Sequence, residues 1–156
     1  MRTATVIGAV LAAGLLTAQD AAAQQAGAPY QPGLGEIMTL TQMRHSKLWF
    51  AGKAGNWDLA AYELDELKEG FDDAVKLYPM HDNVPVGPMI TSLMTTVVAT
   101  LGKAIEAHDP AKFNAAFDSL TGACNSCHQA ANKGFIKIVR PGTSPYTNQS
   151  FAPGRK

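Results

Sequence analysis

Apolar side chains recur every three or four residues in four segments of the chain, which is the spacing of one buried helix face. The clearest stripe comprises Ala60, Leu64, Leu67, Phe71, Ala74 and Tyr78. A second comprises Ile90, Leu93, Met94, Val97, Leu101, Ala104 and Ile105. No segment alternates with the two-residue period of a strand. The pattern therefore predicts an all-α protein.

Cap and turn residues separate the predicted helices, which cover about 34–51, 56–78, 88–108 and 110–138. Asn56 is a suitable N-cap for the second helix, and Asp109 followed by Pro110 is a strong start for the fourth. The fourth is expected to continue to about Ile138, with Gly134 as the position that favours an earlier end. Short connections between four amphipathic helices predict an antiparallel up-down-up-down four-helix bundle within 34–140.

The first 23 residues have the features of a secretory signal peptide. Arg2 gives a positive start, 6–16 form a short apolar stretch, and small residues lead up to a cleavage site after Ala23. We therefore expect export to the periplasm and no membrane span after cleavage. Residues 24–33 are rich in Gly, Pro and Gln and predict an extended lead-in, and 141–156 predict an irregular C-terminal tail.

The composition of the chain argues against several classes of function. The 156 residues include 13 basic and 13 acidic ones, so no net positive charge points to nucleic acid. Two cysteines are too few for a disulfide framework. No catalytic triad, carboxylate pair or phosphate-binding glycine loop stands out, so nothing in the sequence supports an enzyme of these types.

The two cysteines lie in Cys124-Asn125-Ser126-Cys127-His128, which has the C-x-x-C-H spacing of a c-type haem attachment sequence. Thiols three residues apart lie on nearly the same side of a helix, where they can form thioethers with both vinyl groups of one haem. The adjacent imidazole can then ligate the iron. We expect one covalent haem c on Cys124 and Cys127, with His128 as the proximal ligand.

Three other interpretations of the cysteines are weaker. A thioredoxin-like pair opens a helix after a strand, and no strand is predicted here. A structural zinc site needs a fourth ligand, from His81 or His108. A disulfide between Cys124 and Cys127 closes too small a loop to stabilise the fold much.

Given this motif on the last helix of an exported bundle, the chain resembles the cytochrome c-prime superfamily over about 34–138. Cys124, Cys127 and His128 match the family motif directly. The resemblance implies a monohaem cytochrome, and by analogy a homodimer formed through the first two helices. The chain departs from the family in its length, because 28 residues follow His128 and the 141–156 tail has no counterpart.

The sixth iron position separates two functions. In an antiparallel bundle the start of the first helix lies beside the end of the last, so the opposing ligand should come from early in the first helix. Met38 is the favoured distal ligand, and low-spin relatives in the resembled family use a methionine similarly placed. His45, about 10 Å further along nearly the same face, is the alternative.

With a filled sixth position we expect a one-electron carrier rather than an enzyme. A vacant position would instead suit a gas-binding protein for NO or CO, and a third interpretation is a haemless helical binding module with an oxidised cysteine pair. The carrier would need a redox partner protein. Residues 58–73 hold seven acids against one lysine, whereas the chain after Asp118 carries five basic residues and no acid. We therefore expect the basic haem-bearing end to dock an acidic partner.

Overall fold

The computed structural model describes residues 30–154. The predicted signal peptide at 1–23 and most of the lead-in at 24–33 lie outside these residues. Contacts divide the chain into two units, Met1–Gln31 and Pro32–Lys156. In the first unit only Tyr30 and Gln31 are described, and neither has regular structure.

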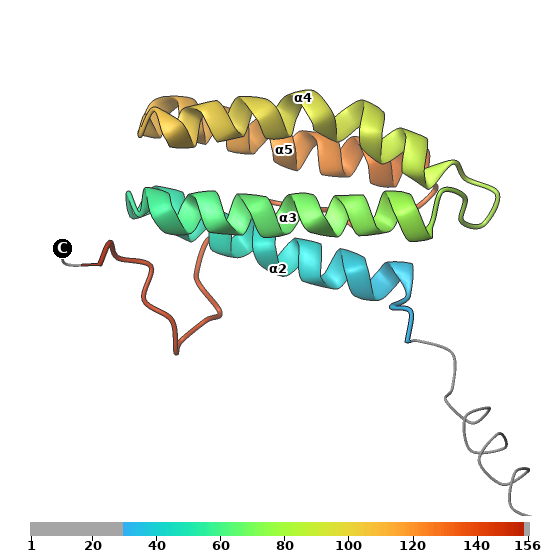
Figure 1. Cartoon of the computed structure of the whole chain (residues 1–156), viewed down its shortest axis with the longest axis horizontal. Helices are drawn as coiled ribbons and strands as arrows, with labels where there is room; N and C mark the ends of the chain where they lie inside the picture. The colour runs from blue at the N-terminus through green and yellow to red at the C-terminus, as the bar shows by residue number, and fades with distance from the viewer. Residues whose placement is uncertain (1–29, 155–156) are drawn as a thin grey trace, which may run out of the picture. The chain divides into compact units, whose positions relative to one another are not determined.

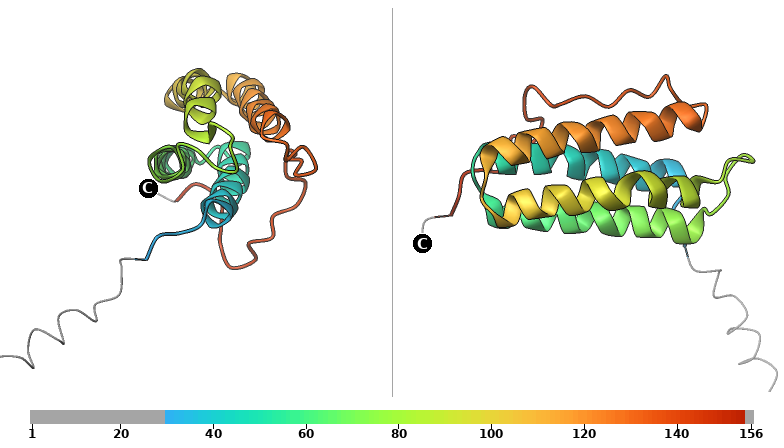
Figure 2. Two further views of the ribbon diagram at one scale, coloured as in Figure 1. Left: turned by 90° about the vertical axis from the view of Figure 1, so that its right-hand side faces the viewer. Right: turned by 90° about the horizontal axis from the view of Figure 1, so that it is seen from above.

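The second unit contains four helices: α2 (Leu34–Lys53), α3 (Trp57–Leu77), α4 (Val86–Glu106) and α5 (Pro110–Ala130) (Figure 1). Successive helices run in opposite directions, and the end-on view in Figure 2 shows them as a bundle. Across residues 30–154 the only β-type pairing is an isolated bridge between His81 and Val84 in the α3–α4 connection. The predicted all-α four-helix bundle is confirmed.

The predicted N-caps also form. The Asn56 side chain accepts a hydrogen bond of 3.2 Å from the Leu59 amide at the start of α3. The Asp109 carboxylate accepts bonds of 3.0 Å from the amides of Ala111 and Lys112 at the start of α5. These bonds satisfy amides that have no partner inside the helix, so the helix starts follow from local sequence alone.

The end of α5 corrects the prediction that this helix continues to about Ile138. It ends at Ala130, and Asn132 adopts a left-handed conformation with φ of 58°. The Lys133 amide then donates back to the His128 carbonyl at 2.7 Å. This left-handed cap turns the chain out of the helix, and asparagine tolerates it better than most residues.

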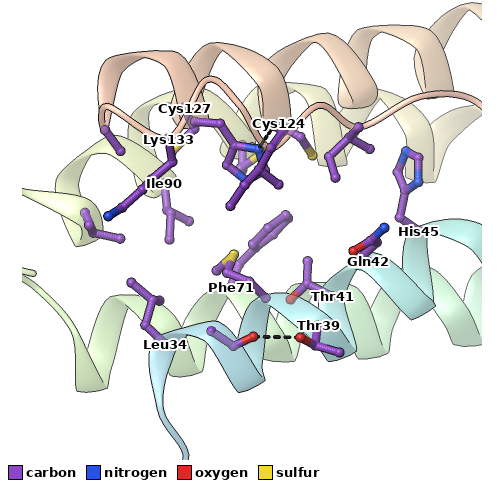
Figure 3. A pocket seen from close by; sticks show the side chains of 18 of the residues that line it. Leu34, Thr39, Thr41, Gln42, His45, Phe71, Ile90, Cys124, Cys127 and Lys133 are labelled. Atoms are coloured by element: carbon purple, nitrogen blue, oxygen red, sulfur yellow. Dashed lines mark hydrogen bonds between the residues drawn. The ribbon is translucent and has the colours of Figure 1, made fainter.

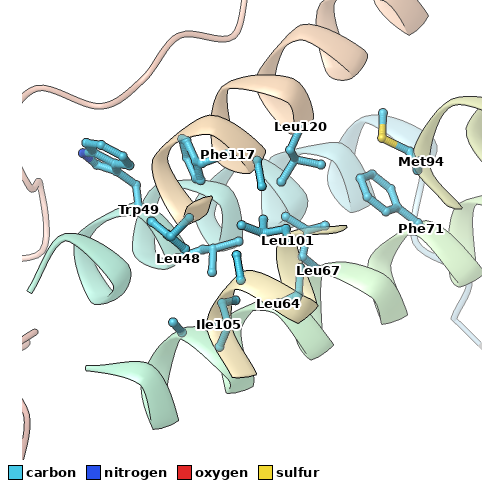
Figure 4. Packing of buried hydrophobic residues seen from close by; sticks show 14 of the residues in the cluster. Leu48, Trp49, Leu64, Leu67, Phe71, Met94, Leu101, Ile105, Phe117 and Leu120 are labelled. Atoms are coloured by element: carbon cyan, nitrogen blue, oxygen red, sulfur yellow. The ribbon is translucent and has the colours of Figure 1, made fainter. Parts of the chain in front are cut away.

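Packing in the bundle is uneven. α2 packs closely on α3, and α4 packs on both α3 and α5, whereas α2 and α5 make few direct contacts. Near the α2–α3 and α4–α5 connections the core is filled by large buried side chains: Leu48, Trp49, Leu64, Leu101, Ile105, Phe113 and Phe117 (Figure 4). The other end of the bundle, where α2 begins and α5 ends, is less completely filled.

Over the described residues 131–154 the chain after α5 is irregular, and it runs back along α5 (Figure 2). Arg140 bonds the Asp118 carboxylate of α5 at 3.0 Å and lies 4.3 Å from the Trp49 ring of α2. Further on, the Phe151 ring packs 5.5 Å from Phe50. The tail therefore contacts both helices of the loosely packed α2–α5 pair.

One helix in the described part of the chain, Val86–Glu106, is long and apolar enough to cross a membrane by length and composition alone. This corrects the expectation that no segment after the signal peptide is long and apolar enough to cross a membrane. The reason is that Lys103 and Glu106 are the only charges in α4 and lie at its end. A core helix of a bundle passes the same test, and one face of α4 packs on its neighbours through Ile90, Met94 and Leu101.

Candidate functional site

A cavity of about 320 Å³ lies at the less filled end of the bundle. Figure 3 shows α2 along one side and the two cysteines of α5 on the other, with Phe71 of α3 between them. Nine of the twenty lining residues carry large apolar side chains: Leu34, Met38, Leu67, Phe71, Val86, Ile90, Met94, Ile136 and Ile138. A concave site with a mostly apolar lining surface and a few polar groups is typical of a cofactor pocket.

All three chemical groups of the C-x-x-C-H motif line this cavity, from the last turns of α5. Cys124 and Cys127 are free thiols rather than a disulfide. Burial, and secondarily the neighbouring Cys127, raises the pKa of Cys124 to about 12, and burial also raises the pKa of Cys127. Such protonated thiols do not resemble the low-pKa thiolate of a thioredoxin-like centre.

The His128 imidazole is held by one of its nitrogens. Its Nδ1 lies 2.9 Å from the backbone carbonyl oxygen of Ile136. A carbonyl can only accept, so Nδ1 carries a proton, and in the neutral imidazole Nε2 then keeps its lone pair. This is the arrangement found at most metal-ligating histidines, in which the second ring nitrogen donates to a carbonyl or carboxylate.

Residues 135–139, which we call the wall strip, close the cavity beside His128. Ile136 and Ile138 line the cavity, whereas Phe135 and Val139 are 81% and 61% exposed. Ile136 is itself 45% exposed, and the strip begins in a turn that the Ile136 amide closes by donating to the Lys133 carbonyl at 2.8 Å. The strip therefore replaces the last two turns of the predicted helix with a thin wall that has an apolar inner face.

Asn125, the first variable residue of the motif, connects the wall strip to α5 by hydrogen bonds. The Asn125 Nδ2 donates to the Ile138 carbonyl at 2.8 Å, and the Ile138 amide donates to Asn125 Oδ1 at 2.8 Å. Asn125 Nδ2 also lies 3.0 Å from the Thr121 carbonyl in the preceding turn. One side chain thus satisfies both backbone groups of Ile138.

Met38 lines the cavity from α2, opposite the motif, and is half-buried. Among described residues a second methionine, Met94 of α4, also lines the cavity. Sequence analysis placed Met94 only in a core stripe, because its helical spacing is that of any buried position. The structure thus brings the favoured distal residue and the motif to one cavity, together with a second thioether.

His45 also lines the cavity, but its Nε2 is engaged with Thr121 Oγ1 at 2.8 Å. The Thr121 hydroxyl donates its one proton to the Phe117 carbonyl at 2.9 Å, so His45 Nε2–H must be the donor in that bond. Burial lowers the pKa of His45 to about 4, which makes it a neutral imidazole. This hydrogen bond from Nε2 to Thr121 therefore connects His45 to α5.

The other two described histidines, His81 and His108, lie in different parts of the bundle. His81 lines the cavity from the α3–α4 connection, whereas His108 stacks on Trp57 at 5.7 Å beside the filled part of the core. Within 30–154, no three His, Cys, Asp or Glu side chains gather as a metal site would require. The zinc interpretation of Cys124 and Cys127 therefore has no geometric support in this part of the chain.

Charges near the motif are more balanced than the sequence suggests. Lys133 lies 3.6 Å from the Asp82 carboxylate, and Arg140 is paired with Asp118. Lys137 has no ion pair among the described residues. The basic end therefore presents less net charge than its composition implies.

The chain matches no family model, no curated protein and no solved structure.

Proposed function

We propose that the chain is an exported monohaem c-type cytochrome that carries single electrons. One observation supports this most directly: both thiols and the imidazole of the C-x-x-C-H motif line one apolar cavity inside a helical bundle. Export rests on the signal-like sequence at 1–23, and N-terminal sequencing of the mature protein tests cleavage after Ala23.

The donor set fits a covalently attached haem c. Cys124 and Cys127 are unpaired thiols available for two thioethers, and His128 keeps an Nε2 lone pair. The cavity volume, about 320 Å³, is at the lower end of the range of about 300–1,000 Å³ for ligand sites. The cavity lies between α2 and α5, which make few direct contacts. We therefore expect these two helices to move apart more easily than any other pair when the cavity has to widen.

Four residues would each have a role in holding the haem. Cys124 and Cys127 anchor the porphyrin, and His128 is the proximal ligand with its tautomer set by the Ile136 carbonyl. Met38 is the favoured distal ligand, since it lines the cavity from the opposite helix. Bound haem supplies an iron centre that cycles between ferric and ferrous forms, and a thioether ligand favours the ferrous form.

His45 is the weaker distal candidate. Its Nε2 already donates to Thr121, so ligation through that nitrogen requires breaking a hydrogen bond of 2.8 Å and reversing the tautomer. Met38 carries no such competing bond. The choice between them remains a proposal, and single substitutions decide it.

A gas-binding protein is the second candidate. The apolar side chains of Leu34 and Phe71 line the same cavity and would suit a small uncharged molecule at a vacant iron position. Such a protein would be high-spin and would bind CO readily, whereas the proposed carrier would be low-spin and resist CO.

Visible spectra with and without CO test these alternatives. A low-spin spectrum indifferent to CO supports the carrier, a high-spin ferric spectrum that changes with CO supports the gas-binding protein, and the absence of a Soret band removes haem. Met38→Ala should convert low-spin iron to high-spin. Met43→Ala is the matched control, because Met43 lies on α2 outside the cavity lining. If His45→Ala alone changes the spin state, Met38 is the wrong ligand.

We propose that the redox partner is an acidic protein. The exposed Lys137 beside the cavity wall supports this, although Asp82 and Asp118 offset the neighbouring cations. The electron-transfer rate should then fall modestly as salt rises. A rate independent of salt would argue against an acidic partner.

A further inference from the structure

We propose that Asn125 is a positioning residue that fixes the proximal imidazole through the wall strip. The proposal rests on the proposed function, in which His128 is the iron ligand. Asn125 occupies a variable position of the motif, where spacing assigns no role to the side chain. Its contacts, not its place in the motif, point to this role.

The chain of contacts runs from Asn125 to the imidazole in two steps. Asn125 holds Ile138 by two hydrogen bonds of 2.8 Å, one in each direction. Two residues earlier on the same strip, the Ile136 carbonyl lies 2.9 Å from His128 Nδ1. Fixing Ile138 therefore fixes the carbonyl that orients the ring.

The strip has two other attachments to α5, one before it and one after it. Directly after the strip, Arg140 bonds the Asp118 carboxylate at 3.0 Å. The strip is joined to α5 at its start by the Lys133 amide, which donates to the His128 carbonyl at 2.7 Å, and the Ile136 amide donates to the Lys133 carbonyl at 2.8 Å. Phe135 and Val139 are largely exposed and add little packing. Asn125 is thus the side chain that holds the strip against α5 between the turn at Lys133 and the Arg140–Asp118 pair.

An amide is the side chain that this geometry requires. It must accept from the Ile138 amide and donate to the Ile138 carbonyl at the same time. Aspartate retains only the acceptor, and alanine has neither. The other variable residue, Ser126, is exposed and bonds only the Gly122 carbonyl in its own helix, at 3.0 Å.

The consequence for His128 is electronic as well as geometric. A proton on Nδ1 that is donated to a fixed carbonyl makes Nε2 a stronger donor to a metal. A stronger nitrogen donor favours ferric iron, so the strip should lower the midpoint potential of the haem-loaded protein. Releasing the strip should raise that potential while leaving both thioether positions intact.

The test compares Asn125→Ala with Ser126→Ala in the full-length haem-loaded protein. In Asn125→Ala we expect amide hydrogen exchange at Ile138 to be at least about tenfold faster, since two hydrogen bonds protect this segment. We also expect a higher midpoint potential. Ser126→Ala should change neither quantity. Asn125→Asp should give intermediate exchange at Ile138, because one of the two bonds remains.

Two results would overturn the proposal: unchanged Ile138 exchange in Asn125→Ala, or faster exchange with an unchanged midpoint potential. The first would show that Asn125 does not hold the strip, and the second that the strip does not act on His128. Failure of the proposed function looks different, because no Soret band would form in any variant. Ile138 exchange in that haem-free chain would still decide whether Asn125 holds the strip.

Discussion

His45 makes the folded protein sensitive to mild acid. Burial lowers its pKa from 6.5 to about 4, so between these values the unfolded chain binds a proton that the folded chain does not. Stability must therefore fall as pH falls through this window. For these two pKa values, lowering the pH from 7 to 5 removes about 2 kcal/mol of unfolding free energy.

The measurement is urea unfolding at pH 7 and pH 5 for the wild type and His45→Gln. The variant removes the titrating group and leaves an amide that can still bond Thr121. The stability lost between the two pH values should be smaller by about 2 kcal/mol in the variant. His81→Gln is the control, because it makes the same substitution at a histidine whose side chain is 40% exposed in a loop rather than buried in the bundle.

Glu63 titrates with the opposite sign. Burial raises its pKa, so the folded chain holds this proton more tightly and acid stabilises the fold at this position. Because Glu63 is present in both proteins, its effect cancels in the comparison. Equal pH dependence in wild type and His45→Gln would refute a neutral, buried His45.

Four substitutions test the packing and one helix cap. Gly52→Ala should destabilise the fold by about 1–3 kcal/mol, because the added Cβ meets the Phe113 ring, whereas Gly102→Ala should be neutral or stabilising, since its nearest neighbour is 3.6 Å away. Asp109→Ala should cost about 1 kcal/mol through loss of the α5 cap. Phe151→Ser should lower the melting temperature by releasing the tail from α2, and should raise its proteolysis rate. Denaturation curves and limited chymotrypsin digestion, which can cut the tail after Tyr146, check these outcomes.

The helix starts were predictable because they depend on neighbours in the sequence. Asn56 and Asp109 cap through amides two or three residues away, so a short window contains the whole interaction. The end of α5 was not predictable in this way. It depends on Asn125 pairing with Ile138, 13 residues further on, and on a left-handed Asn132.

Part of the candidate site could likewise be found from spacing alone. Cys124, Cys127 and His128 follow one motif, and Met38 follows from the topology of an antiparallel bundle. Met94 could not be separated from core residues, because a buried helix face and a cavity wall share one periodicity. The acceptor for His128 was missed because a backbone carbonyl leaves no mark in the sequence.

The sparse contact between α2 and α5 also has a consequence for the order of folding. The α2–α3 and α4–α5 pairs are each joined by three residues, so their contacts close short loops and should form early. The pairing of the first helix with the last closes the longest loop of the domain and should form late. Until then the cavity beside Cys124 and Cys127 should lack the wall that α2 provides through Leu34 and Met38. We therefore expect slow closure of this seam to leave an interval in which an attachment enzyme can reach both thiols.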